Sequence, residues 1–327
     1  MLEKLDGKGL LIHHWDTDGI CSARLLLGYL SDKKIENKTP ILGNYFLTKK
    51  ELEKYSNYDF VIIADMALPK ENILKLATNS KVVIFDHHLQ EEILEVEHNN
   101  PIIKGESPDK YPSASWIIND YLGNKPNLFA FLGVVGDHEQ RIKNNTAFYQ
   151  MITEFCEQQN LTFDDFLKMV YLLDSNYKLG DKKAVESAPH ILLENSNVSN
   201  ILENTQWNKN LAKLSEEIRR QLEKPYEMID GTIFKKIDTP YNIISTITRK
   251  IAWESGKNTI VLNGGFFKDK DQLYVRSNKN VKPLIKRGKS LGFKCGGKKE
   301  VLGAIIPKNK TDCFVEEIIE FLSKNKR

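Results

Sequence analysis

Apolar and polar residues follow each other along the first 90 positions in a pattern that switches between strands and helices. Short apolar runs such as GLLIHHW are typical of buried strands, and each is followed by a segment with helical periodicity. Repeated alternation of this kind predicts a parallel sheet with helices on both faces. We expect strands in GLLIHHW, PILGNYF, DFVIIADM and KVVIFDHH, and helices in CSARLLLGYLSDK, TKKELEKYS and PKENILKLAT.

The rest of the chain divides into a mostly helical stretch and a smaller α/β region. Amphipathic runs predict helices from about residue 112 to residue 222, including one long run from Val198 to Leu222. Lys224-Pro225 ends that run, because proline disfavours helix in the residue before it. MIDGTIFKKI and TIVLNGGFFKDKDQLYVRS then predict two hairpins. We therefore expect an α/β fold in three parts: residues 1–140, a helical connector over 141–225, and a smaller α/β domain over 226–327.

The composition is that of a globular protein, with 41% hydrophobic residues. The first residues, MLEKLDGKGLL, are charged, and no apolar run approaches the ~20 residues that a membrane span needs, so we expect a cytoplasmic protein that does not contact a membrane. The charge is uneven: residues 241–327 contain 19 Lys and Arg against 8 Asp and Glu, and residues 1–240 contain 28 against 36. Such a basic region attracts phosphates, most commonly those of nucleic acid.

Four separate places put Asp or His where a strand or helix gives way to a loop. In the first, His14, Asp16 and Asp18 recur at every second position. Because an extended chain sends alternate side chains to opposite faces, these three can project together while His13 points away. The carboxyl ends of parallel strands meet at one edge of a sheet, so the other places can converge with the first. They are Asp65, the run Asp86, His87 and His88, and Asp137 at a helix end.

This set of carboxylates and imidazoles suits Mn²⁺, or Mg²⁺, better than structural zinc, which prefers thiolates. Six candidate ligands are too many for one partly open site but suit two ions ~3.5 to 4 Å apart that share a carboxylate. Such a pair activates a water and neutralises the charge that builds up as the water attacks phosphorus. Each residue alone has a simpler interpretation as a turn or helix-cap residue. Four such places together favour a centre that hydrolyses phosphate esters.

The order D-x-D-G, a strand-end Asp, D-H-H and a later G-D resembles the four motifs of the DHH phosphoesterase superfamily, over residues 9–140. CGGKKEVLGAIIP, residues 295–307, resembles the glycine-rich signature of the DHH-associated domain found in the RecJ and nanoRNase branches. Lys298 departs from it, since His usually stands there, and Leu302 replaces a small residue. The resemblance implies a DHH catalytic domain over 1–140, a DHH-associated domain over 226–327, and an active site in the cleft between these lobes.

The resemblance also implies a role for each site residue. His14, Asp16 and Asp65 would bind one metal ion, and Asp18, Asp65, His87 and Asp137 the other, with Asp65 as the bridge. His88 would face the substrate phosphate as a donor, and Asp86 would orient an imidazole. The residues expected to bind substrate are Arg276, Ser277, Gly296, Gly297 and Lys298.

The basic C-terminal region favours a polymeric substrate, because each bound phosphate needs its own positive partner. We therefore expect a Mn-dependent, RecJ-like exonuclease that hydrolyses single-stranded DNA or RNA. The alternative within the same chemistry is a nanoRNase or 3'-phosphoadenosine-phosphate phosphatase acting on short oligonucleotides or small nucleotides. A binding subunit of a replication complex ranks lower, because all six candidate ligands are present. An active nuclease that docks on a replication or repair partner such as GINS is also compatible with the sequence.

Overall fold

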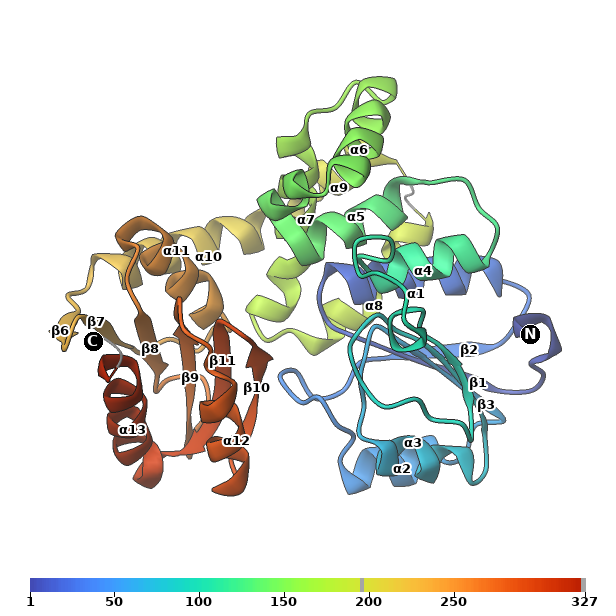
Figure 1. Cartoon of the computed structure of the whole chain (residues 1–327). Helices are drawn as coiled ribbons and strands as arrows, with labels where there is room; N and C mark the ends of the chain where they lie inside the picture. The colour runs from blue at the N-terminus through green and yellow to red at the C-terminus, as the bar shows by residue number, and fades with distance from the viewer. Residues whose placement is uncertain (195–196, 325–327) are drawn as a thin grey trace. The chain divides into compact units, whose positions relative to one another are not determined.

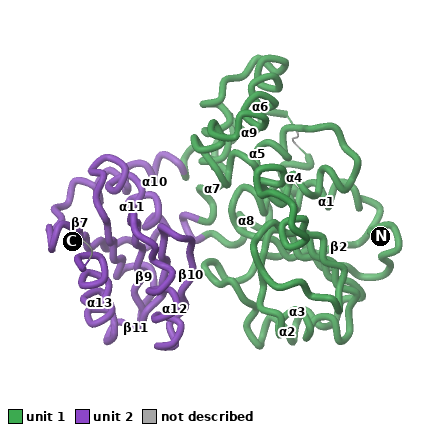
Figure 2. The backbone as a smooth tube through the Cα atoms, in the orientation of Figure 1, with its two compact units in different colours: residues 1–177, 181–210 green, residues 178–180, 211–327 purple. Residues whose placement is uncertain are grey.

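The computed structural model describes residues 1–194 and 197–324, which form two units (Figures 1 and 2). Unit 1 comprises residues 1–177 and 181–210, and unit 2 comprises residues 178–180 and 211–327. The chain thus enters unit 2 briefly at residues 178–180 and again after residue 210, within one long helix. The predicted helical connector is therefore shared between the two units, and its separate role stays a prediction. Residues 195–196 of that connector, and 325–327 of the last predicted domain, lie outside the described residues.

Unit 1 is built on a five-stranded sheet of parallel strands in the order β2-β1-β3-β4-β5. The central strands β1 and β3 are buried along their whole length. Their continuous apolar sequences follow from this, because a parallel sheet is covered on both faces. The prediction of a parallel α/β sheet is confirmed. The strands are β1 (Gly9–His13), β2 (Ile35–Lys38), β3 (Phe60–Ala64), β4 (Lys81–Phe85) and β5 (Glu97–Asn99).

One predicted strand is wrong. The segment PILGNYF, residues 40–46, is a loop, and the edge strand β2 lies just before it. Pro40 cannot donate to a ladder, and Gly43 has a φ of +87°, so neither residue suits the interior of a strand. The polar sequence IENK of β2 is compatible with an edge position. The resulting β2–α2 loop, residues 39–48, follows the carboxyl end of β2.

Helices cover both faces of this sheet (Figure 1). α2 and α3 lie on one side, and α1, α4, α5 and α8 lie on the other, where α1 packs against the other three. The helices of unit 1 are α1 (Thr17–Tyr29), α2 (Lys49–Tyr55), α3 (Lys70–Ala77), α4 (Ala114–Tyr121), α5 (Leu128–His138), α6 (Thr146–Gln158), α7 (Phe163–Lys178), α8 (Lys182–Glu194) and α9 (Val198–Leu202).

The polar run predicted as one helix from Val198 to Leu222 is two helices, α9 and α10 (Thr205–Glu223). Asn204 separates them, because its side chain accepts a hydrogen bond from the backbone N–H of Trp207 and so starts a new helix. α10 ends before Lys224-Pro225, as predicted.

Even this long helix is polar, and none of the helices in the described part of the chain is long and apolar enough to cross a membrane.

Unit 2 contains a six-stranded mixed sheet in the order β10-β11-β9-β8-β7-β6. α11 packs into one hydrophobic cluster of this unit, and α12 and α13 pack into another. The two predicted hairpins, β6-β7 and β8-β9, are confirmed. The strands are β6 (Glu227–Ile229), β7 (Thr232–Ile237), β8 (Thr259–Asn263), β9 (Lys270–Arg276), β10 (Lys294–Lys298) and β11 (Val301–Pro307), and the helices are α11 (Ile244–Ser255), α12 (Lys282–Ser290) and α13 (Thr311–Ser323).

Candidate metal centre

The candidate ligands gather at the carboxyl edge of the unit 1 sheet. β1, β3 and β4 end there side by side, and each is followed by acidic or imidazole side chains. α5 brings Asp137 to the same place from its last turn. Three sets of side chains have ligand atoms within 4.8 Å of one another: His14, Asp16 and Asp65; Asp18, His87 and Asp137; and Asp65, His87 and His88.

Asp16 and Asp18 reach this place in a different way from the one predicted. β1 ends before residue 14 and α1 begins at residue 17, so the alternation of an extended strand does not continue through Asp18. Asp16 is the N-cap of α1. Its Oδ1 accepts from the backbone N–H of Gly19 at 3.2 Å, and its Oδ2 lies 2.8 Å from His14 Nδ1. This tight turn requires glycine at 19, because a Cβ there would lie 2.3 Å from the carbonyl oxygen of His14.

Asp18 is buried against the N-terminus of α4. Its Oδ2 accepts from the N–H of Ala114 at 2.7 Å, and its Oδ1 accepts from the N–H of Ser115 at 2.9 Å. Unpaired N–H groups and the helix dipole favour a carboxylate at this position. α5 leaves room for the contact at Gly133, since a Cβ there would lie 2.2 Å from Asp18 Oδ1. The start of α4 is therefore part of the site, although the sequence analysis assigned no site residue to it.

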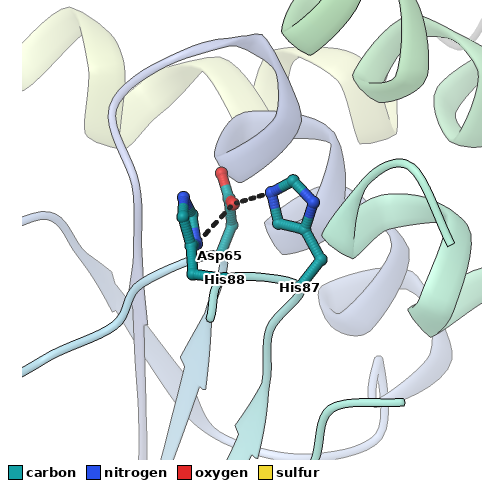
Figure 3. A group of neighbouring side chains, drawn as sticks. All are labelled: Asp65, His87 and His88. Atoms are coloured by element: carbon teal, nitrogen blue, oxygen red, sulfur yellow. Dashed lines mark ion pairs between the residues drawn. The ribbon is translucent and has the colours of Figure 1, made fainter. Parts of the chain in front are cut away.

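Asp65 belongs to two of the three sets and lies between His87 and His88 in Figure 3. Its side chain is 2% exposed, and its two oxygens lie 3.6 Å from His14 Nδ1 and 3.5 Å from His87 Nε2. Its φ of +58° is uncommon for a residue other than glycine. Such strain persists only where the surrounding structure enforces it, and it is frequent at functional sites. The turn after β3 thus directs this carboxylate towards histidines from two neighbouring turns.

His88 is oriented by Asp86. The two side chains lie 2.7 Å apart through His88 Nδ1 and Asp86 Oδ1. Asp86 is fully buried, and its second oxygen accepts from Gln90 Nε2 at 2.5 Å. Asn100 adds a hydrogen bond from its side-chain amide to the backbone carbonyl of His88. The imidazole that Asp86 contacts is therefore His88, whose side chain is 44% exposed.

The carboxylates and imidazoles of the centre shift one another's pKa. Burial raises the pKa of Asp65 well above its usual range, and the neighbouring Asp18 and Asp16 add to this shift. Burial and the charge of Asp137 raise the pKa of Asp18 to about 6. Burial opposes protonation of His87, yet the Asp137 carboxylate raises its pKa well above the usual value. The centre thus holds buried, mutually repelling carboxylates, which a divalent cation would stabilise.

Several ligand atoms lack a hydrogen-bond partner among the residues that the structure describes. They include His14 Nε2, Asp65 Oδ2 and His87 Nε2. His87 Nε2 lies 3.1 Å from Asp137, but this contact does not have hydrogen-bond geometry. Buried polar atoms are nearly always paired, and each unpaired one costs about 1–3 kcal/mol. Unpaired nitrogen and oxygen atoms that converge in this way fit divalent cations with mixed imidazole and carboxylate ligands.

Asp174 of α7 supports the turn between β1 and α1, and the sequence analysis missed it. Its Oδ1 accepts from the N–H of Thr17 at 3.1 Å and from the Thr17 hydroxyl at 2.8 Å. Thr17 stands between Asp16 and Asp18, so this contact holds the backbone that carries both carboxylates. Asp174 is 157 positions away from Thr17 and follows no motif. Only its place as a buried Asp in the apolar run FDDFLKMVYLLD could have indicated it.

Two further histidines near the centre make backbone contacts. His13 is fully buried, and its Nδ1 lies 2.6 Å from the carbonyl oxygen of His14. His138 Nε2 lies 3.1 Å from the carbonyl oxygen of Pro112. Neither belongs to a set of candidate ligands among the described residues, and His13 was expected to point away from them.

The candidate substrate-binding residues lie in unit 2, at one end of its sheet. Lys298 and Arg276 both pair with Val301, from opposite sides, so a single strand separates them. The guanidinium of Arg276 stacks over the ring of Trp253, 5.1 Å from its centroid. The two basic residues that were expected to bind substrate, Arg276 and Lys298, thus lie at the same end of the sheet.

The fold itself accounts for three other predicted residues, in part. The Ser277 hydroxyl donates to Asn258 Oδ1 at 2.8 Å. Gly297 has a φ of +145°, and a Cβ there would lie 2.0 Å from the carbonyl oxygen of Val301, so the pairing of β10 with β11 requires glycine at this position. Gly296 is different, because no described atom lies within 4 Å of a Cβ built there. Of the two glycines, Gly296 is the one without a steric requirement inside unit 2.

A parallel α/β sheet with carboxylates and imidazoles gathered at its carboxyl edge defines the class of the protein as an α/β protein with a candidate divalent-cation centre. The model of the DHH family, N-terminal domain, matches residues 9–172, and the chain belongs to this family, whose members are metal-dependent phosphoesterases. No curated protein matches the sequence.

Solved structures share the fold at low sequence identity. RecJ from Thermus thermophilus in complex with Mn²⁺ has a TM-score of 0.70 at 15% identity; the match covers 97% of this chain and 52% of that one. Exonuclease RecJ bound to manganese has a TM-score of 0.68 at 15% identity, with coverage of 97% and 90%. The pGpG-specific phosphodiesterase PggH from Vibrio cholerae has a TM-score of 0.57 at 14% identity, with coverage of 97% and 99%. The chain is thus RecJ-like in fold and spans about half of the Thermus RecJ.

Proposed function

We propose that this protein is a Mn-dependent phosphodiesterase that hydrolyses single-stranded DNA or RNA as an exonuclease. The observation that carries the proposal is the set of buried carboxylate and imidazole atoms without hydrogen-bond partners at the carboxyl edge of the sheet. One cation would be held by His14, Asp16 and Asp65, and the other by Asp18, Asp65, His87 and Asp137. Asp65 would be shared, consistent with its place in two of the three sets.

When bound, a pair of divalent cations supplies a water nucleophile at neutral pH and neutralises the charge that develops on the phosphoryl oxygens. The choice of Mn²⁺ is supported by the RecJ structures with that ion, and one RecJ structure holds Mg²⁺ instead. The chain supplies the fixed geometry. The cap at Asp16, the α4 contact to Asp18 and the strained backbone at Asp65 hold the three carboxylates in place before substrate binds.

His88 is the residue that we propose to contact the reacting phosphate. Asp86 engages its Nδ1, which leaves Nε2 as the nitrogen on the opposite side of the ring. With Nδ1–H directed at Asp86, the imidazolium form of His88 can donate its Nε2 proton to a phosphoryl oxygen or to the leaving oxygen, and the buried carboxylate stabilises that form. Gln90 in turn holds Asp86, so the dyad has a fixed direction.

For the substrate, we propose a single strand whose backbone is contacted by unit 2. The positive charge of residues 241–327 supports this choice, and Arg276, Gly296 and Lys298 are the proposed contacts. The structure modifies two of the earlier assignments. Both donors of Ser277 are engaged, its hydroxyl by Asn258 and its backbone N–H by the carbonyl oxygen of Glu300, so Ser277 would not contact a phosphate directly. Gly297 would keep β10 paired closely with β11 so that Gly296 can approach a phosphate.

A second candidate is a phosphodiesterase for dinucleotides or short oligonucleotides. It is favoured by the fold likeness to the pGpG-specific phosphodiesterase, of which the match covers 99%. The chemistry at the cations would be the same, and only the length of the bound substrate would differ.

Hydrolysis of an end-labelled single-stranded 20-mer and of a dinucleotide, each with Mn²⁺, tests the proposal. We expect the 20-mer to be the better substrate by kcat/KM and to be shortened from one end. A preference for the dinucleotide would overturn the polymer assignment in favour of the second candidate. Asp65→Asn protein, purified in parallel, is the control for contaminating nucleases. Loss of activity in EDTA and its recovery with Mn²⁺ would test the need for a cation.

A further inference from the structure

Tyr45 is an exposed aromatic residue beside the candidate metal centre. It lies in the β2–α2 loop and is 61% exposed, more than any other Phe, Tyr or Trp in the described part of the chain. A large ring in contact with water loses the stabilisation that burial would give, so its exposure calls for a reason. Its position after the carboxyl end of a parallel strand is one where α/β proteins bind ligands.

The ring of Tyr45 stacks on one of the candidate ligands. Its centroid lies 5.7 Å from that of the His14 imidazole, with an angle of 30° between the planes. It also lies 5.1 Å from the ring of Trp15, which is buried and itself packs 4.3 Å from His14. Three rings therefore form one cluster, and Tyr45 is its exposed member. One side of the Tyr45 ring rests on this cluster, and 61% of the residue's surface remains accessible.

The loop that carries Tyr45 is fixed at both ends. A turn closes on its N-terminal side through a hydrogen bond from Asn44 N–H to the carbonyl oxygen of Ile41. On its C-terminal side, Leu47 N–H donates to Asn72 Oδ1 at 2.7 Å. A capping box then begins α2 directly after the loop. A ring held in this way loses little conformational entropy when a ligand stacks on it.

We propose that Tyr45 is a stacking platform for the nucleobase of a nucleotide whose phosphate lies at the candidate metal centre. Bases stack on aromatic side chains irrespective of sequence, because every base has a π-face. Contact between Tyr45 and His14 puts this platform directly beside the proposed cations. The inference rests on the proposed function and makes it more specific, since it assigns a residue beside the proposed cations to the base of the bound nucleotide.

The test compares strands with and without a base near each end. Short deoxythymidine strands carry a single abasic tetrahydrofuran residue at the first, second, penultimate or last position. KM and kcat are measured with Mn²⁺ for the full chain, for Tyr45→Ala and for Tyr45→Phe. In the unmodified protein, we expect the abasic residue at one of these four positions to raise KM by about 5- to 100-fold relative to the intact strand. Tyr45→Ala should raise KM for the intact strand by a similar factor and abolish the effect of that abasic position.

The controls separate stacking from a structural role of the ring. Tyr45→Phe keeps the ring and should keep the preference for the base. Tyr29→Ala removes another exposed tyrosine, at the far end of α1, and should leave the preference unchanged. The Mn²⁺ affinity of Tyr45→Ala, measured by titration, should stay within about twofold of the unmodified value. A tenfold loss of Mn²⁺ affinity, with equal effects on intact and abasic strands, would mean that Tyr45 only shields His14, and would overturn the proposal.

Failure of this inference is distinguishable from failure of the proposed function. If the unmodified protein hydrolyses intact and abasic strands equally well, the base subsite is wrong and the phosphodiesterase assignment stands. If it hydrolyses no strand while Mn²⁺ binds, the proposed function fails, and the subsite with it.

Discussion

The candidate metal centre of unit 1 and the β10–β11 end of unit 2 differ in how their polar groups are satisfied. In unit 1, ligand atoms of His14, Asp65 and His87 are buried and have no hydrogen-bond partner among the described residues. In unit 2, Gly296 and Lys298 are exposed on a strand whose backbone pairs along its length with β11. The polar atoms of the first region need a ligand to be paired, and they are held in place before it binds. The backbone of the second region is paired without a ligand.

The backbone of these two regions differs as well. Asp65 adopts a positive φ although it has a side chain, and Gly19 and Gly133 permit contacts that any larger residue would block. At the β10–β11 end of unit 2, the positive φ of Gly297 is explained by its close pairing with β11. Substitutions in unit 1 should therefore disrupt the site steeply, whereas those in unit 2 should weaken binding by degrees.

Asp65→Asn is expected to have the largest effect, because it removes the carboxylate that both cations would share. Activity with Mn²⁺ should fall at least about a hundredfold. Burial and the neighbouring Asp18 and Asp16 raise the pKa of Asp65, so its ionised form destabilises the folded, metal-free protein above the usual Asp pKa. Asn carries no charge and tolerates the positive φ. Thermal unfolding in EDTA at neutral pH should therefore occur at the same or a higher temperature than for the unmodified protein.

The gain in stability should disappear as the pH falls below about 4, where Asp65 is protonated in both the folded and the unfolded states. Retention of more than a tenth of the activity in Asp65→Asn would contradict a shared carboxylate. An unfolded variant would contradict the electrostatic argument.

Gly133→Ala should come next, and it acts through packing. The added Cβ would lie 2.0 Å from Ser115 Oγ and 2.2 Å from Asp18 Oδ1, so Asp18 or α5 must move. Overpacking of this kind typically costs about 1–3 kcal/mol of stability, and the displacement of Asp18 should weaken Mn²⁺ binding as well. Denaturant unfolding and Mn²⁺ titration would measure the two effects.

Gly28→Ala is the matched control for this packing prediction. It makes the same change in a helix of the same unit, where the nearest contact of the new Cβ would be 3.3 Å, to Leu193. It should keep activity and Mn²⁺ affinity. Equal behaviour of the two variants would remove the steric argument for Gly133.

The sequence predicted the candidate ligands and the parallel sheet because both follow local rules. Buried parallel strands read as apolar runs, and the loops after them carry the functional groups. All six candidate ligands belong to groups that the structure brings together. The alternation argument for Asp16 and Asp18 was wrong, however, because it required the strand to continue where a helix begins.

The unpredicted parts depend on contacts that are distant in sequence. Asp174 reaches Thr17 across 157 positions, and α4 reaches Asp18 across 96 and 97. β10 was missed because KCGGK has low strand propensity, and its pairing with β11 overrides that preference. A single sequence does not identify the distant partner in such contacts.

Asp174→Ala tests one of these distant supports. Loss of the acceptor for Thr17 should loosen the turn that carries Asp16 and Asp18, and partners of this kind typically contribute about 10- to 100-fold to metal affinity or activity. Asp174→Asn keeps an oxygen acceptor and should restore most of the affinity. Mn²⁺ titration of both variants, together with KM and kcat, provides the measurement. An equal loss in both variants would show that the charge of Asp174 matters more than its hydrogen bonds.

Lys298→Ala should have the smallest effect and reports on unit 2. An exposed lysine contributes to phosphate binding as a point charge, so its loss should raise KM by a few fold and leave kcat nearly unchanged. One phosphate contact fewer should also reduce the slope of log K against log salt by about 0.7 for a single strand. Lys50→Ala, on the exposed part of α2, changes the same charge in unit 1 and should leave this slope unchanged. If Lys298→Ala instead lowered kcat about a hundredfold with an unchanged KM, unit 2 would take part in the chemical step, and the contrast between a prepared centre and an adaptable surface would not hold.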